Sequence, residues 1–101
     1  MIRSATQKQR IPADVLEGVA AALRVLAHPH RLRIVELLEH DDLSVGELAA
    51  ELEIPPAACS QHLSLMRAHG LLSCRREGKV AYYQVAHPHA RNVIHCIREH
   101  M

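Results

Sequence analysis

Residues 43–83 constrain the fold of this 101-residue chain more than any other stretch. They begin with a strong helix signal, because Ser44 and Glu47 have the S-x-x-E spacing of a capping box. In that motif each of the two side chains accepts a hydrogen bond from the backbone N–H of the other residue. The spacing therefore predicts a helix that starts here and runs through Leu52.

A second helix is predicted directly after a turn at residues 53–55. Pro56 suits its first position, since the N–H that proline lacks has no partner there, and Gly70 is typical of a residue just past a helix end. Residues 71–76 and 79–85 then read as two strands of a hairpin. The order helix, tight turn, helix and hairpin is that of a winged helix-turn-helix, whose second helix fits the major groove of DNA.

Three further helices complete the expected fold. One is predicted over residues 14–27, a second begins at Pro29, and the last runs from Pro88 to the C-terminus. The predicted fold is mainly α with a small β-hairpin, in the order α-α-α-α-β-β-α. Residues 1–12 are expected to be a flexible basic tail, and residues 13–101 a single winged helix-turn-helix domain for DNA binding and dimerisation.

Composition supports one small helical domain. Nearly half of the residues are hydrophobic, yet Tyr82 and Tyr83 are the only aromatic ones, so the core must consist of Leu, Val, Ile and Ala. No apolar run approaches the roughly 18 residues of a membrane span, and the N-terminus lacks a signal-peptide core. The three cysteines show no CxxC spacing, which argues against a disulfide framework. We therefore expect a cytoplasmic protein with no membrane partner.

The net charge of +1 conceals a segregation of charge along the chain. Residues 36–53 contain seven acids and no lysine or arginine, whereas residues 67–79 carry four bases against Glu77 alone. Phosphate binding depends on local positive potential, so a near-neutral total does not exclude DNA. A solvated charge run is the alternative interpretation, but the place of these bases on a hairpin beside the second helix favours DNA.

The helix that begins at Pro56 has two different faces. Cys59, Leu63 and Met66 fall at i, i+4 and i+7 and form the stripe expected to be buried. The opposite face is small and polar, suited to hydrogen bonds with base edges or phosphates, although ordinary helix surface is the alternative. The candidate DNA-binding residues are Ala57, Ser60, Gln61, His62, Ser64 and Arg67 on the helix, with Arg75, Arg76 and Lys79 on the hairpin.

Together these motifs resemble the ArsR/SmtB family of bacterial winged-helix repressors. The resemblance implies a homodimer joined by the first and last helices and bound to a pseudo-palindromic operator in double-stranded DNA. It also implies repression that ends when an inducer binds and the operator is released. It covers residues 19–100 and rests on LAHPHRLRIVELL (26–38), LSVGELA (43–49), CSQHLSLMRAHGLL (59–72) and REGKVAYYQV (76–85).

Many similar proteins hold a metal between paired C-terminal helices, using Asp-x-His on one helix and His-x-x-Glu or His-x-x-His on the other. This chain offers His87 and His89, and His100 lies eleven residues further on, which places it on the same helix face as His89 and Cys96. Such ligands suit zinc, nickel, cobalt or copper. However, His87 stands where the motif has Asp, and no fourth ligand follows before Met101. A dimer interface with histidines at the helix ends is the open alternative.

A redox-sensitive thiol is the alternative to a metal site as the sensor of the inducer. A repressor with no inducer site of its own is a third hypothesis. Similar persulfide- and oxidant-responsive regulators use a Cys in the second helix, which has none here. The thiolate metal site of other relatives needs Cys where Ser44 and Gly46 stand. Cys59, Cys74 and Cys96 remain redox candidates, and modification of Cys59 would push the DNA-reading helix off its core.

Two further classes are weighed against a repressor. The sequence has no glycine-rich phosphate loop, nucleophile elbow or HExxH motif, so we do not expect an enzyme. A winged-helix domain used only for protein contacts would lack DNA binding that weakens steeply with salt. His28 and His30 bracket Pro29 between the first two helices, where we expect capping and packing rather than metal ligation.

Overall fold

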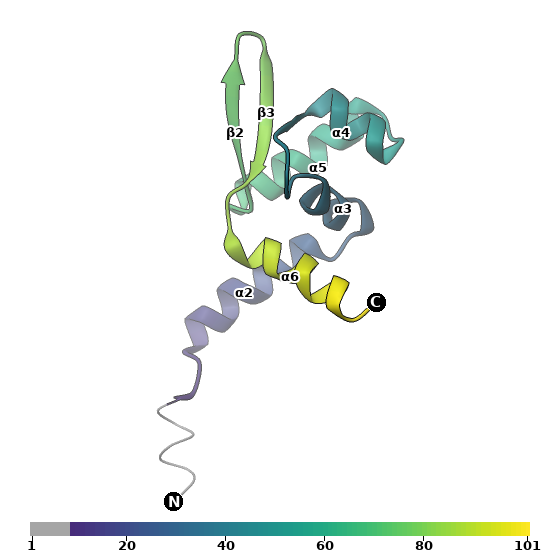
Figure 1. Cartoon of the computed structure of the whole chain (residues 1–101). Helices are drawn as coiled ribbons and strands as arrows, with labels where there is room; N and C mark the ends of the chain where they lie inside the picture. The colour runs from purple at the N-terminus through teal and green to yellow at the C-terminus, as the bar shows by residue number, and fades with distance from the viewer. Residues whose placement is uncertain (1–8) are drawn as a thin grey trace, which may run out of the picture.

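The computed structural model describes residues 9–101 and has the predicted order of helices and hairpin (Figure 1). Residues 1–8, most of the predicted tail, lie outside the described residues. The one element that the sequence did not predict is a two-residue strand before the third predicted helix. The elements are α2 (Ala13–Leu26), α3 (Pro29–Leu37), β1 (Leu43–Ser44), α4 (Val45–Leu52), α5 (Pro56–Ala68), β2 (Leu72–Glu77), β3 (Val80–Val85) and α6 (Pro88–Glu99).

The predicted helix boundaries follow from local chemistry. The capping box at the start of α4 is complete, with the Ser44 side chain accepting from the Glu47 N–H at 3.2 Å and the Glu47 carboxylate accepting from the Ser44 N–H at 2.9 Å. Pro56 stands in the first turn of α5, and Gly70, just past its end, has a φ of 73°. That left-handed conformation lets the chain turn from α5 into the sheet.

The strands form a three-stranded antiparallel sheet in the order β1-β3-β2. β2 and β3 pair along their full length, from Leu72 opposite Val85 to Glu77 opposite Val80. Gly78 makes the connecting turn with a φ of 63°, a backbone conformation that residues other than glycine rarely adopt. This hairpin, called the wing below (residues 72–85), projects beyond the helices (Figure 1).

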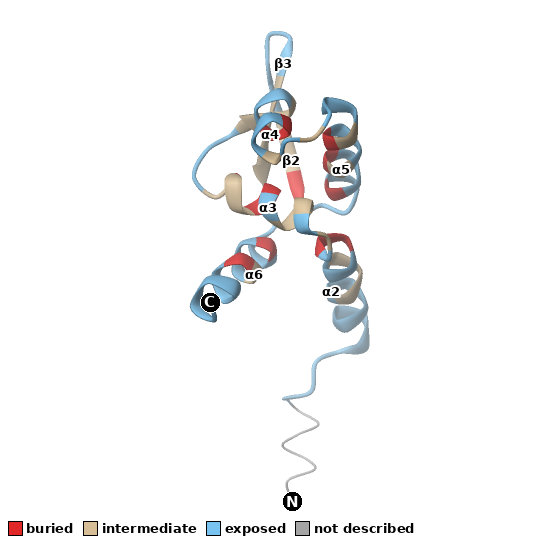
Figure 2. Cartoon of the chain, turned by 90° about the vertical axis from the view of Figure 1, so that its right-hand side faces the viewer, coloured by how far each residue is buried: buried red, intermediate tan, exposed pale blue. Residues whose placement is uncertain are grey.

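The core lies where α3, α4 and α5 meet the base of the wing, as the buried segments in Figure 2 show. Its side chains are all apolar: within residues 9–101 no polar or charged residue is buried. The largest side chains that are fully buried are Ile34, Leu48, Leu63, Met66 and Leu71. This core fixes α5 against α3 and α4, so the orientation of the second helix of the motif is set by packing.

Helices α2 and α6 extend away from this core, and much of each is exposed (Figure 2). On α2 the exposed large apolar side chains include Leu16 and Leu23, at 52% and 47% of their full accessibility. On α6 Ile97 is 44% exposed, and a pocket whose lining includes Val19, Leu23, Val93 and Ile97 joins the two helices. No helix among residues 9–101 is long and apolar enough to cross a membrane.

Candidate nucleic-acid interface

Helix α5 has the two faces that the sequence pattern predicts. Cys59, Leu63 and Met66 are completely buried on one side. Of the candidate DNA-binding residues on this helix, Ala57, Ser60, Gln61, Ser64 and Arg67 are exposed. The outward face therefore carries small and polar groups that can approach a duplex closely, while the inward face anchors the helix. Contact of these residues with DNA stays a prediction.

The three cations of the wing are all exposed, but they are not equivalent. Arg75 donates to the Asp42 carboxylate at 3.1 Å, also pairs with Glu77, and lies 5.4 Å from the centre of the Tyr82 ring. The hydrogen bond from Arg75 to Asp42 raises the pKa of the guanidinium, with Glu77 adding to the effect. By contrast, Arg76 and Lys79 form no ion pair within residues 9–101.

His62 lies apart from the exposed set, which differs from its predicted place among DNA-binding residues. It follows Cys59 by three positions and precedes Met66 by four, so helical geometry places it at the edge of the buried stripe. The ring is half-buried, and its Nδ1 accepts a hydrogen bond from Nε of Arg31 at 3.1 Å. The spacing of His62 from Cys59 and Met66, which are both buried, could have indicated this inward orientation from the sequence.

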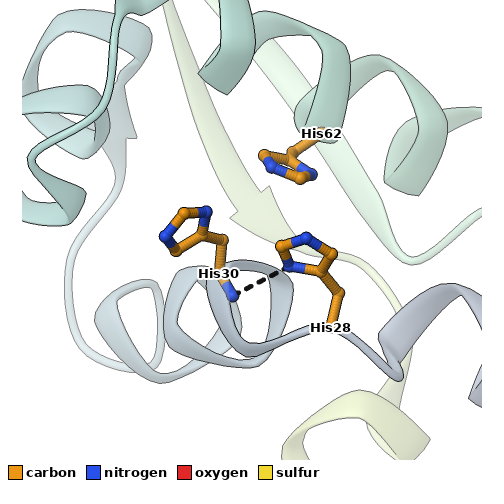
Figure 3. Close-up of side chains that lie close together, drawn as sticks. All are labelled: His28, His30 and His62. Atoms are coloured by element: carbon orange, nitrogen blue, oxygen red, sulfur yellow. Dashed lines mark hydrogen bonds between the residues drawn. The ribbon is translucent and has the colours of Figure 1, made fainter.

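The His62 ring belongs to a group of three imidazoles, called the histidine cluster below: His28, His30 and His62 (Figure 3). His28 precedes α3 and caps it, because its Nδ1 accepts from the His30 N–H at 3.1 Å. That capping was expected, but the approach of His62 from α5 was not. Burial lowers the pKa of His62, and the neighbouring His28, Arg31 and His30 lower it further.

The predicted ligands on α6 do not gather at one point within this chain. His87 caps the helix by accepting from the His89 N–H at 3.2 Å, and Nδ1 of His100 donates to the Cys96 carbonyl at 2.8 Å. His89 and His100 are eleven residues apart, which corresponds to about 16 Å along a helix axis. One ion cannot bind both from the same helix, so a site there requires a second subunit.

The three cysteines are all free and differ in exposure. Cys59 is buried, and this burial raises the pKa of its thiol, which disfavours the reactive thiolate. Cys74 is half-buried on β2 opposite Tyr83, and Cys96 is exposed on α6. The predicted switch at Cys59 therefore lacks the exposure that reaction with an oxidant requires, whereas Cys96 has it.

Known proteins share both sequence and fold with this chain. Residues 26–75 match the family model of a helix-turn-helix domain. The biofilm growth-associated repressor of Agrobacterium fabrum is 39% identical over 91 residues, which cover 86% of this chain and 78% of that protein. A transcriptional repressor SmtB homolog of Synechocystis is 30% identical over 95 residues, which cover 94% of this chain and 72% of that protein.

Solved structures agree with the sequence relatives. HlyU from Vibrio cholerae, a transcriptional activator, has a TM-score of 0.81 at 30% identity over 87% of this chain and 96% of that one. The homodimeric winged helix-turn-helix DNA-binding domain of a possible ArsR-family regulator from Mycobacterium bovis has a TM-score of 0.76 at 28% identity. That match covers 85% of this chain and 80% of that one.

Fold, exposed α5 face and relatives together define the class of winged helix-turn-helix transcriptional regulators, which bind DNA. The chain belongs to the ArsR/SmtB family. Its relatives are transcriptional regulators, which confirms the expectation that it is not an enzyme.

Proposed function

We propose that this protein is a homodimeric transcriptional repressor that binds a pseudo-palindromic operator and releases it when an inducer binds. The observation that carries the proposal is the arrangement of α5. Its outward face is small and polar, its inward face is locked into the core, and the wing beside it carries exposed cations. This is the geometry that lets a helix enter the major groove while the wing holds the sugar-phosphate backbone.

Within the proposal, Gln61 and Ser60 read base edges. The Gln61 amide both donates and accepts, which matches the N6 and N7 atoms of adenine. Ala57, in the first turn of α5, leaves room for the helix start to approach a phosphate, which the free N–H groups of that turn favour. Arg76 and Lys79, which no carboxylate pairs within residues 9–101, supply phosphate contacts from the wing.

The dimer is inferred from the exposed apolar faces of α2 and α6. Side chains such as Leu16, Leu23 and Ile97 lose solvent contact if two copies pair through these helices, which favours association. The homodimeric relative from Mycobacterium bovis supports this assembly. Two α5 helices related by a two-fold axis then meet half-sites about one helical turn apart.

In this proposal the protein represses transcription when it is bound to its operator. The relatives from Agrobacterium and Synechocystis are both repressors, whereas HlyU is an activator. For the inducer, we propose a transition-metal ion (zinc, nickel, cobalt or copper) held between the α6 helices of two subunits by His89 of one and His100 of the other. Exposed Cys96 is the third candidate ligand, and through its thiol it is also the residue best placed for the competing redox response.

The operator test uses selection of binding duplexes from a random pool, followed by fluorescence anisotropy at several salt concentrations. We expect an enriched pseudo-palindrome and an affinity that falls steeply with salt. Failure to enrich any sequence, or salt-independent binding, would support a protein-contact role instead.

The inducer test adds each metal to the reduced dimer on its operator, with His89→Ala and His100→Ala as variants. Release that neither variant alters would contradict the α6 metal site.

A further inference from the structure

The histidine cluster joins two segments that are distant in the sequence, through three side chains that have no part in the proposed DNA reading. His28 and His30 flank the start of α3, and His62 reaches them from α5 (Figure 3). One ring nitrogen from each residue lies within 4.8 Å of the other two, and no other group of three potential ligands comes this close within residues 9–101. All three side chains are half-buried, so the cluster is partly shielded from water yet accessible.

Capping and packing explain only part of this arrangement. His28 alone supplies the acceptor that α3 needs, and Arg31 satisfies Nδ1 of His62. The His30 ring makes no hydrogen bond within residues 9–101, although it lies 5.6 Å from the His62 ring and 5.3 Å from that of His28. No carboxylate forms an ion pair with these imidazoles in the described chain, and the Arg31 guanidinium donates a hydrogen bond to His62.

We infer that His28, His30 and His62 form a binding site for a borderline divalent transition-metal ion, with Zn²⁺ as the best match. Neutral imidazoles are preferred ligands of zinc, and three protein ligands leave a fourth position open. In a tetrahedral site with bonds of about 2.0–2.1 Å, ligand nitrogens lie about 3.3 Å apart. Since the three nitrogens already lie within 4.8 Å of one another, each needs to move by less than about 1 Å.

Coordination would change two hydrogen bonds that tie the cluster to α3. A neutral imidazole has one nitrogen lone pair to share. Nδ1 of His28 now accepts from the His30 N–H, and Nδ1 of His62 accepts from Arg31. A metal on Nδ1 takes the lone pair that now accepts the hydrogen bond. A metal on Nε2 moves the ring proton to Nδ1, which then can no longer accept. The ion would replace both bonds and link the α2–α3 turn directly to α5.

This site is separate from the metal site proposed on α6, and the two can be tested apart. The experiment uses the full-length, reduced, chelator-treated protein with Co²⁺ as a visible probe and Zn²⁺ as its competitor. His28→Asn keeps a side-chain acceptor suited to capping α3 and removes the imidazole. His30→Ala removes a ring that makes no hydrogen bond within residues 9–101. His40→Ala, at an exposed histidine outside the cluster, is the matched control.

We expect the histidine cluster to bind one Co²⁺ per chain, in addition to any ion held on α6, with the intense visible bands of tetrahedral coordination and displacement by Zn²⁺. Both His28→Asn and His30→Ala should weaken binding by about tenfold or more while circular dichroism stays unchanged, since loss of a ligand costs at least as much as loss of its supporting contact. The His40→Ala variant should bind as wild type does. The inference is overturned if wild type binds no Co²⁺, if folded cluster variants bind it unchanged, or if only His89→Ala and His100→Ala reduce it. None of these readouts depends on DNA binding.

Discussion

Replacing Arg76 and Lys79 with glutamine removes two exposed wing cations that pair with no carboxylate among residues 9–101. A dimer would lose four such charges. Each phosphate contact contributes about 0.9 to the slope of log affinity against log salt concentration. With one phosphate per cation, the double variant should lower the magnitude of that slope by about 3.6. Operator affinity should fall similarly for specific and random duplexes, because phosphates carry no sequence information.

The assay is fluorescence anisotropy with labelled duplex over a salt series. Arg75→Gln is the informative comparison: Asp42 and Glu77 already offset its charge, so its slope should change less per cation than in the double variant. Arg91→Gln, an exposed cation on α6, is the control and should leave the slope unchanged. An unaltered slope in the Arg76 and Lys79 double variant, or an equal change in the control, would refute the assignment of the wing to phosphate contacts.

Three further perturbations probe separate features. Gln61→Ala should reduce the preference for operator over random duplex by about 1–3 kcal/mol per half-site in anisotropy competition, and unchanged preference would remove Gln61 from base reading. Ser44→Ala should cost about 1 kcal/mol of unfolding free energy by breaking the capping box, seen as a Tm lower by about 4–8 °C at fixed protein concentration; an unchanged Tm would contradict the role of the cap. Leu23→Glu should shift the dimer toward monomer in sedimentation, whereas the exposed Arg24→Glu should not, and a dimer that withstands Leu23→Glu would exclude this face.

The parts of the fold set by local chemistry were predictable from the sequence. The capping box, the proline at the start of α5 and Gly70 act over a few residues, so they marked the helices correctly. β1 was missed because two residues cannot display a strand periodicity, and its existence depends on pairing with Tyr82 and Tyr83 of β3. The hydrophobic stripe of α5 was predictable because burial on one side imposes the helical period.

The parts of the site set by tertiary contacts were not predictable. Arg75 reaches Asp42 across 33 positions, and His62 reaches Arg31 across 31, so neither contact leaves a periodic signal. Helical periodicity predicts a shared face for His89 and His100, but periodicity gives the angle between two residues around the axis and not their distance along it. That separation is why a metal on α6 depends on a second subunit.

We expect the two α5 helices of a dimer to enter the major groove of one operator. Methylation interference at guanine N7, an atom exposed in the major groove, tests it most directly on the selected duplex. We expect two interfering patches whose centres lie about 10–10.5 base pairs apart, or a multiple of that, and we expect Gln61→Ala to weaken both. A single patch, or binding indifferent to major-groove methylation, would contradict it.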